Sequence, residues 1–437
     1  MKFLDINDKG FEQEFAAILA RGEESGRDVE PVVLAIIAAV RGRGDAALLE
    51  YTSRFDRLNV LSVAELEVTA DEIDAAFARC SLEDLAALKL AVERVARFHE
   101  KQKVQTWLST EEPDIMLGQM ITPLARVGIY VPGGKASYPS SVIMNAVPAR
   151  VAGVTEIIMV VPTPDGEINP HVLAAARLSG VDRIFRIGGA QAIAALAYGT
   201  ATVPKVDKIT GPGNIYVATA KKLVFGQVGI DMIAGPSEIL VINDGSGNPA
   251  HIAADLLSQA EHDELASSIL ITTERKFGED VAKEVDKQLQ ELSRESIARS
   301  SWDSYGAIII AGSLTEAIVF SNRIAPEHLE LAVSDPFAIL AQIKNAGAIF
   351  MGHYTPEAAG DYLAGPNHTL PTGGTARFFS PLSVDDFVKK SSIVYFSRDG
   401  LKRLGEDIVR IAGLEGLEAH GKSVSIRLKG DSPGDVN

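Results

Sequence analysis

Apolar residues recur at helical spacing through the first quarter of the chain. An apolar run extends from Val32 to Val40, two glycines interrupt it, and a second helical pattern begins at Asp45. Residues 82–101 again place apolar side chains three and four positions apart, with charged side chains between them. This pattern predicts a helical N-terminal region over residues 1–120, part of which joins a later α/β domain.

The pattern changes at about residue 120, where short β-rich runs begin to alternate with alanine-rich amphipathic runs. Proline and glycine stand at the ends of these runs and mark turns. The predicted strands are 126–130, 156–161, 182–187, 208–210, 239–242, 269–271, 307–310 and 347–351. The predicted helices between them include 171–178, 191–198 and 249–260. Strands that alternate with helices in this way predict parallel sheets with helices on both faces.

The expected fold class is therefore α/β, with two Rossmann-like doubly wound domains, a helical N-terminal segment and a C-terminal tail. The expected boundaries are 1–120 for the helical region, 121–238 and 239–379 for the two α/β domains, and 380–437 for the tail. The usual GxGxxG fingerprint is absent. A match to its alanine-ended form at residues 42–47 follows a helical run rather than a strand, so we interpret it as a turn between helices.

Composition narrows the class of protein. The chain has 437 residues, 46% of them hydrophobic and 23% charged, which fits a globular protein of two or three domains. Its net charge of −16 argues against nucleic-acid binding, because a phosphate backbone selects basic surfaces. The single cysteine, Cys80, excludes an intrachain disulfide and a cysteine-based zinc site. With no signal-peptide pattern and no run long enough to span a membrane, we expect a soluble cytoplasmic protein.

Two glycine-containing loops follow predicted strands. Residues 130–135 (Tyr-Val-Pro-Gly-Gly-Lys) end the first strand of the first α/β domain, and residues 211–214 (Gly-Pro-Gly-Asn) join a strand to a helix. Glycine lets the backbone approach a ligand closely, and a helix N-terminus favours phosphate. Each loop is a candidate NAD-binding loop, although an ordinary turn is the commoner use of either pattern.

Three histidines, His262, His328 and His420, stand among acids or amides in the sequence and suggest a candidate metal site. Gln259 and His262 are three residues apart, which would place them on one face of a helix. Asp361 could add a carboxylate and His420 a second imidazole, and His368, close to Asp361 in the sequence, has lower priority. The simpler interpretations are a solvated helix end for the first pair, a turn or cap for the aspartate, and a surface position for His420.

The tripeptide 326–328 (Pro-Glu-His) is the strongest acid–base candidate. The His328 imidazole titrates near neutral pH and could remove the hydroxyl proton of an alcohol as hydride leaves, while Glu327 could activate water. The alternative is that both side chains lie on the surface after a proline turn. Ser237 could bind a substrate or cap a turn, but the segment 235–238 lacks the second glycine of the serine-hydrolase motif.

Many short segments together resemble the histidinol dehydrogenase family over nearly the whole chain. They include Tyr-Val-Pro-Gly-Gly at 130–134, Gly-Pro-Gly-Asn at 211–214, Gly-Pro-Ser-Glu at 235–238 and Ala-Pro-Glu-His-Leu at 325–329. The other segments are 44–45, 51–52, 55–56, 188–193, 205–209, 258–262, 360–362, 367–372, 415 and 420. Any one segment is a weak signal, but their order and completeness are not expected by chance.

The resemblance implies an NAD-dependent, four-electron oxidation of L-histidinol to L-histidine through a bound aldehyde, with one zinc ion per subunit. It implies His328 as general base and Glu327 as the residue that activates water. The implied zinc ligands are Gln259, His262, Asp361 and His420, and the implied cofactor contacts are Tyr130, Gln191 and Asn214. The implied substrate contacts are Ser237, Gln259, His262, His328, Asp361, Glu415 and His420. The family is a homodimer in which the C-terminal tail reaches the partner's site, so Glu415 and His420 would act across the interface.

Three other functions are left open by the sequence. A related enzyme could oxidise another hydroxylated compound, such as a sulfonated diol, but the Glu415 carboxylate suits an ammonium-bearing substrate and repels an anion. A zinc hydrolase would use Glu327 with a metal-bound water, and the two glycine loops after strands argue against it. A non-catalytic binding protein would keep only the fold, and the full set of titratable residues argues against that.

Overall fold

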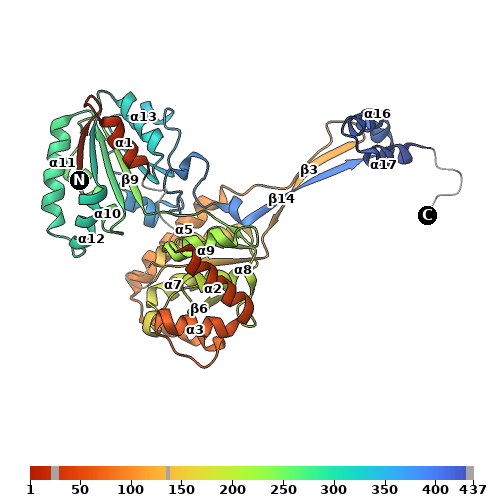
Figure 1. The fold of residues 1–437 in the computed structure, drawn as a ribbon, viewed down its shortest axis with the longest axis horizontal. Helices are drawn as coiled ribbons and strands as arrows, with labels where there is room; N and C mark the ends of the chain where they lie inside the picture. Colours follow the sequence, from red (N-terminus) through yellow and green to blue (C-terminus); the bar gives the residue numbers. More distant parts are fainter. Residues whose placement is uncertain (21–28, 134–137, 430–437) are drawn as a thin grey trace. The chain divides into compact units, whose positions relative to one another are not determined.

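The computed structural model describes residues 1–20, 29–133 and 138–429. The chain divides into two compact units, one of residues 1–103 with 124–387 and one of residues 104–123 with 388–437. The first unit contains two parallel sheets, and the second contains a small antiparallel sheet (Figure 1). Residues 134 and 135 of the candidate cofactor loop lie outside the described residues.

The first parallel sheet has five strands. They are β4 (Arg126–Tyr130), β5 (Glu156–Val160), β6 (Arg183–Phe185), β7 (Lys208–Thr210) and β8 (Gly229–Ile230). Its helices are α2 (Glu30–Arg43), α3 (Asp45–Asp56), α4 (Ala70–Arg79), α5 (Leu82–Glu100), α6 (Pro139–Ala152), α7 (Pro170–Leu178), α8 (Gly189–Tyr198) and α9 (Ile215–Val224). The strand order is β6-β5-β4-β7-β8, so the first strand along the chain, β4, is in the middle. β5 and β6 are added on one side of it, and β7 and β8 on the other. One apolar core joins α2, α3, α8 and α9 to the sheet. Helices α6 and α7 pack against each other, and α4 and α5 pack on them.

The second parallel sheet has six strands in the order β1-β11-β10-β9-β12-β13. They are β1 (Lys2–Asp5), β9 (Glu238–Asn243), β10 (Ser267–Thr272), β11 (Ala307–Ile310), β12 (His328–Ala332) and β13 (Ala348–Met351). The helices that cover it are α1 (Phe11–Leu19), α10 (Pro249–Ala260), α11 (Arg275–Leu289), α12 (Glu295–Tyr305) and α13 (Leu314–Ile324). One core packs α10, α11 and α12 on one face, and another packs α1 and α13 on the opposite face.

These two sheets confirm the predicted α/β class with two doubly wound domains. The turn predicted at residues 42–47 is also confirmed, because Gly44 ends α2 and precedes α3 with φ 54°. The helical prediction is wrong for the first residues of the chain. Lys2–Asp5 form β1, which pairs in parallel with β11 of the second sheet.

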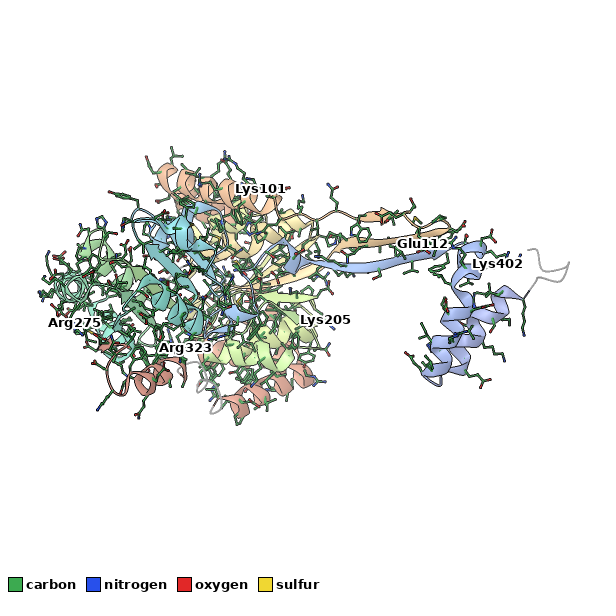
Figure 2. All side chains as sticks on the ribbon, turned by 90° about the horizontal axis from the view of Figure 1, so that it is seen from above. Lys101, Glu112, Lys205, Arg275, Arg323 and Lys402 are labelled. Carbon is green, nitrogen blue, oxygen red and sulfur yellow. The ribbon has the colours of Figure 1, made fainter. Side chains whose placement is uncertain are left out.

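Two arginines fasten this N-terminal segment to the second sheet's helices. Arg275 and Arg323 are labelled in Figure 2. Arg275 of α11 donates to the Asp5 carboxylate at 2.8 Å, and Arg323 of α13 binds Glu12 of α1 through two nitrogens at 3.0 and 2.8 Å. These pairs are partly exposed, so each adds little free energy by itself. The stronger anchor is apolar, since Phe11, Phe15 and the sheet share one core.

Strand β12 is a second element that the sequence did not predict. Its residues His328–Ala332 are all buried, although Glu330 stands in the middle of the apolar pattern. A carboxyl group in a central strand hides the continuous apolar run by which a buried parallel strand is usually recognised. The strand matters because its first residue is the acid–base candidate His328.

The second unit contains a three-stranded antiparallel sheet and two helices. The strands, in the order β14-β3-β2, are β14 (Val388–Phe396), β3 (Ile115–Pro123) and β2 (Trp107–Ser109). The helices are α16 (Arg398–Leu414) and α17 (Glu418–Leu428), which pack against each other. The sequence indicated only a mixed helical pattern here. None of the described helices of either unit is both long and apolar enough to cross a membrane.

Candidate active site

The acid–base candidate His328 lies at the amino end of a strand, next to the amino end of a neighbouring strand. Glu238 is the first residue of β9 and His328 is the first residue of β12, where it pairs in register with Ile239. The alternative that Glu327 and His328 lie on the surface is wrong, because they are only 7% and 4% exposed. Backbone hydrogen bonds of the sheet therefore fix the position of both side chains.

His328 has one ring nitrogen bound and one free. Its Nδ1 lies 3.0 Å from the carbonyl oxygen of Glu238, which can only accept, so this nitrogen donates. Its Nε2 points toward the carboxylates of Glu357 and Asp361, at 3.6 and 3.7 Å, and has no hydrogen-bond partner in the described structure. Burial lowers the pKa of His328, but the charges of Glu357, Glu327 and Asp361 outweigh it and raise the pKa well above its usual value. The neutral form of this ring is therefore a strong proton acceptor at Nε2.

The buried Glu327 and the half-buried Glu238 form an acidic pair beside this histidine. Glu327 Oε2 accepts a hydrogen bond from the backbone N–H of Glu238 at 2.9 Å. Burial raises the pKa of Glu327 to about 7 and, with the charge of Glu327, raises the pKa of Glu238 to about 8. A carboxyl that titrates near neutral pH can both take and return a proton, which is what activation of water requires.

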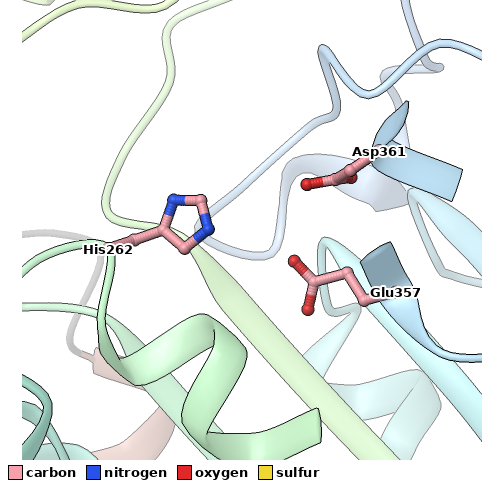
Figure 3. A group of neighbouring side chains, drawn as sticks. All are labelled: His262, Glu357 and Asp361. Atoms are coloured by element: carbon pink, nitrogen blue, oxygen red, sulfur yellow. The ribbon is translucent and has the colours of Figure 1, made fainter. Parts of the chain in front are cut away.

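Three side chains come together as a possible metal site. One ligand atom each from His262, Glu357 and Asp361 lies within 4.8 Å of the others (Figure 3). Gln259 is buried beside them, and its amide nitrogen, in the orientation set by its neighbours, donates to both Glu357 carboxylate oxygens at 2.8 and 3.1 Å. His368 Nδ1 lies 4.0 Å from Asp361 Oδ1.

The charges of these groups fit a divalent cation. Burial alone would raise the pKa of Asp361, but the neighbouring imidazoles of His328, His368 and His262 lower it, so the carboxylate is ionised. Burial lowers the pKa of His262, which keeps its ring neutral. Neutral imidazole and ionised carboxylate are the forms that bind metals, and oxygen with nitrogen ligands suit zinc and also manganese or cobalt.

The local structure differs from the sequence prediction in two respects. Helix α10 ends at Ala260, so His262 lies in the following turn rather than on the same helix face as Gln259; its N–H donates to the Gln259 carbonyl at 3.1 Å. Glu357 was not recognised as a site residue. It follows Pro356 in a polar segment that has the composition of a surface loop, yet it is 3% exposed and its N–H donates to the buried Glu330 at 2.8 Å.

An open cavity of about 490 Å³ reaches this group of residues. His262 lines it together with Tyr138, Met144, Arg294 and Tyr362. The cavity is large enough for a small amino alcohol, and His262 is its link to the possible metal site. Ser237 precedes β9 directly and is half-buried.

The candidate cofactor residues lie where a doubly wound sheet binds dinucleotides. Tyr130 ends β4, Gln191 is in the first turn of α8, and Asn214 caps α9 by accepting from the N–H groups of Tyr216 and Val217 at 3.1 and 3.2 Å. Carboxyl ends of strands and helix N-termini are the usual ligand-binding edge of such a sheet. The Gln191 amide is 1% exposed, and neither of its polar atoms has a hydrogen-bond partner within the described ranges.

A buried ion pair fixes the loop at residues 211–214. Lys221 and Asp231 bind each other with side chains 3% and 1% exposed. The Lys221 amine donates to the Gly211 carbonyl at 2.9 Å, and Asp231 accepts from the Gly211 N–H at 2.8 Å. Gly211 has φ 111°, and a Cβ there would lie 2.1 Å from the Tyr130 carbonyl oxygen, so no other residue fits. The pair therefore holds this loop against β4.

Asp56, the last residue of α3, is a buried carboxyl group beside the start of α8. It is 6% exposed and accepts from the Gly188 backbone; burial nevertheless raises its pKa from 3.8 to about 6. Because the folded-state pKa is the higher one, Asp56 favours the folded state below about pH 4, and this contribution is lost as the pH rises through about 6.

Asp56→Asn should therefore change the pH dependence of stability. Relative to the original protein, we expect the variant to gain up to about 3 kcal/mol of unfolding free energy between about pH 4 and pH 7, because the cost of a buried charge disappears. Urea unfolding at both pH values measures this difference. Equal gains at the two values would show that Asp56 does not titrate in this range.

Glu415 and His420 belong to the second unit. Glu415 follows the last residue of α16, and His420 is in the first turn of α17. In the first unit, three of the predicted metal ligands lie together, namely Gln259, His262 and Asp361. The participation of Glu415 and His420 stays a prediction.

Comparisons with known proteins identify the family of the chain. The family model described as histidinol dehydrogenase matches residues 19–428. The histidinol dehydrogenase of Geobacter metallireducens is 83% identical over 99% of both chains, and that of Pseudomonas fluorescens is 55% identical over 99% of this chain and 98% of its own. The crystal structure of histidinol dehydrogenase from Elizabethkingia anophelis superposes with a TM-score of 0.92 at 38% identity, covering 98% of each chain.

Proposed function

Because the chain belongs to the histidinol dehydrogenase family, an oxidoreductase family whose name places it in histidine biosynthesis, we propose that it oxidises L-histidinol to L-histidine with two NAD molecules and a bound zinc ion. The observation that supports this best is the free Nε2 of His328, which faces the possible metal site from a rigid strand end. The comparisons give no support to the sulfonated-diol, hydrolase or binding-protein alternatives.

The first oxidation needs a base beside the alcohol. We assign this role to His328, whose Nε2 would accept the hydroxyl proton while hydride leaves the same carbon for the nicotinamide, giving the aldehyde. The carbonyl of Glu238 keeps the Nδ1 proton in place and so holds the ring in the tautomer that exposes Nε2.

The second oxidation needs water. We assign its activation to Glu327, whose pKa of about 7 allows it to take a proton as water adds to the aldehyde. The hydrate anion formed in this way then loses a second hydride and one more proton to give the carboxylate. The aldehyde must stay bound until this step, because a free aldehyde is reactive.

The metal would be held by Gln259, His262 and Asp361, with His420 from a partner subunit of a homodimer. Glu357 is near enough to join these ligands or to orient Gln259. The ion would supply a positive charge that positions the imidazole and amine of the substrate. Tyr130, Gln191 and Asn214 would contact NAD, and Ser237 and Glu415 would contact the substrate together with the metal-site residues and His328. We place this reaction in the cytoplasm, where NAD is available.

The number of NADH molecules formed per L-histidinol tests the proposal. With purified protein and excess NAD, we expect two NADH per substrate, loss of activity on zinc removal, and recovery when zinc is returned. One NADH would mean that the aldehyde leaves before the step assigned to Glu327. No NADH would contradict the proposed substrate or cofactor.

A further inference from the structure

Glu330 is a buried acid in the middle of strand β12, on the same face of the sheet as His328. Side chains alternate between the two faces of a strand, so Leu329 and Leu331 belong to the core that α1 and α13 cover, and Ala332 to the core that α10 covers. Glu330 therefore points toward α10, and it is 4% exposed. A buried carboxyl group lowers stability unless it is hydrogen-bonded, whereas an apolar side chain would complete this core. The hydrogen bonds of Glu330 indicate what the carboxyl group does.

The first of these bonds holds the helical segment that carries two residues of the possible metal site. Helix α15 (Glu357–Ala359) runs on without a break to Ala364. Its N-cap is Pro356, which has no polar side chain, so the first backbone N–H of the helix needs another acceptor. Glu330 Oε1 accepts this N–H at 2.8 Å. Asp361 follows one turn later, so the same bond sets the position of the Asp361 carboxylate as well.

A second hydrogen bond holds Glu330 itself. The carboxyl groups of Glu330 and of Asp255, which is in α10, hydrogen-bond each other, so the two share a proton. Gln259 is one turn after Asp255 on the same face of α10, and its amide nitrogen donates to the Glu357 carboxylate. The hydrogen bonds of these four residues, closed by the backbone of α10, form a ring that joins α10, β12 and α15.

This ring lies directly behind the possible metal site. His262 follows Gln259 in the turn after α10. Asp361 follows Glu357 in the helical segment, and the ligand atoms of the two carboxylates and of His262 lie within 4.8 Å of one another. The ring therefore sets the distance between the two parts of the site. Groups that hydrogen-bond to metal-site residues from outside commonly orient the ligands in this way.

We propose that Glu330, held by Asp255, is a positioning residue that fixes the helix beginning at Glu357 at the distance from α10 that a bound metal ion requires. This rests on the proposed function, because it takes a metal ion at this site as given. The role needs only an acceptor for the Glu357 N–H and a hydrogen-bond partner for Asp255, so a neutral amide of the same shape should serve as well.

The zinc affinity of two Glu330 variants tests the proposal. Glu330→Leu puts an apolar side chain of similar volume in the core but cannot accept the N–H, and we expect the Kd for zinc to rise by about 10- to 100-fold. Glu330→Gln keeps an oxygen for that N–H and a donor for Asp255, so its Kd should stay within about threefold of the original. Competition against a chelator measures Kd, and urea unfolding of the zinc-free proteins separates a loss of affinity from a loss of structure.

Two further variants complete the test. Asp255→Ala, at a half-buried position, frees Glu330 without changing the core and should raise the Kd at least about threefold. Asp244→Ala is the matched control, because Asp244 also accepts a backbone N–H, that of Ser334 at 2.9 Å, but beyond the carboxyl ends of β9 and β12. This control should bind zinc as the original protein does.

The outcomes separate this proposal from the proposed function. An unchanged Kd in both Glu330→Leu and Asp255→Ala would overturn the assignment of Glu330, and so would a rise in Glu330→Gln or Asp244→Ala equal to that in Glu330→Leu. An original protein that binds zinc in a Glu330-dependent way but does not oxidise L-histidinol would contradict the proposed function and leave the assignment standing. An original protein that binds no zinc would contradict both.

Discussion

Replacing His328 with Asn is expected to lower kcat for L-histidinol by about two to four powers of ten, the range for loss of a general base. Asparagine can still donate from its side-chain amide to the Glu238 carbonyl, but it has no nitrogen that accepts a proton near neutral pH. The measurement is the steady-state rate of NADH formation together with zinc content, which should be retained because His328 is not among the proposed ligands.

His353→Asn is the matched control for this variant. His353 hydrogen-bonds Ser246 at the opposite end of the second sheet, so its loss should leave the rate nearly unchanged. Near-normal turnover in the His328 variant would remove this residue from the mechanism. A fall in rate that accompanies loss of zinc would instead make His328 a residue of the metal site.

Replacing Asp361 with Asn is expected to weaken zinc binding by at least about a hundredfold, because partners that merely orient metal ligands already account for about 10- to 100-fold. The lost carboxylate charge cannot be replaced by the neighbouring Glu357 without breaking its hydrogen bonds to Gln259. Competition against a chelator of known affinity measures the change, and activity should recover only at high zinc concentration.

Asp335→Asn controls for removal of an aspartate elsewhere in the same domain. Asp335 caps a short helix that follows β12 and accepts from the Ala338 N–H at 3.2 Å, away from the amino ends of the strands. This variant should bind zinc as the original protein does. Unchanged zinc affinity in the Asp361 variant would contradict the proposed ligand set.

Most of the fold could be predicted from the sequence because its strands and helices have the periods expected of them. The runs at residues 239–242 and 307–310 are apolar on both faces, as buried parallel strands are, and both became central strands. Two strands of the second parallel sheet were missed for identifiable reasons. Glu330 interrupts the apolar pattern of β12, and the short β1 gains its place only by pairing with β11, about 300 residues later in the chain.

The candidate site was predictable only in part. His328, His262 and Asp361 could be proposed because their residue types suit the chemistry and because the chain resembles a family whose motifs contain them. Glu357 could not, since its segment has the composition of a loop and its burial depends on the contact with Glu330. The local reasoning about His262 also failed, because helix α10 stops two residues before it.

The ion pair between Lys221 and Asp231 constrains how this protein can change over time. Loss of either partner alone leaves an uncompensated buried charge and costs about 3–5 kcal/mol, a large part of the stability of a typical domain. Replacing both together with apolar residues of similar volume can be nearly neutral. Each single-step mutational path to another pairing therefore passes through a poorly folded intermediate, so variant libraries aimed at the Gly211 loop should vary positions 221 and 231 together.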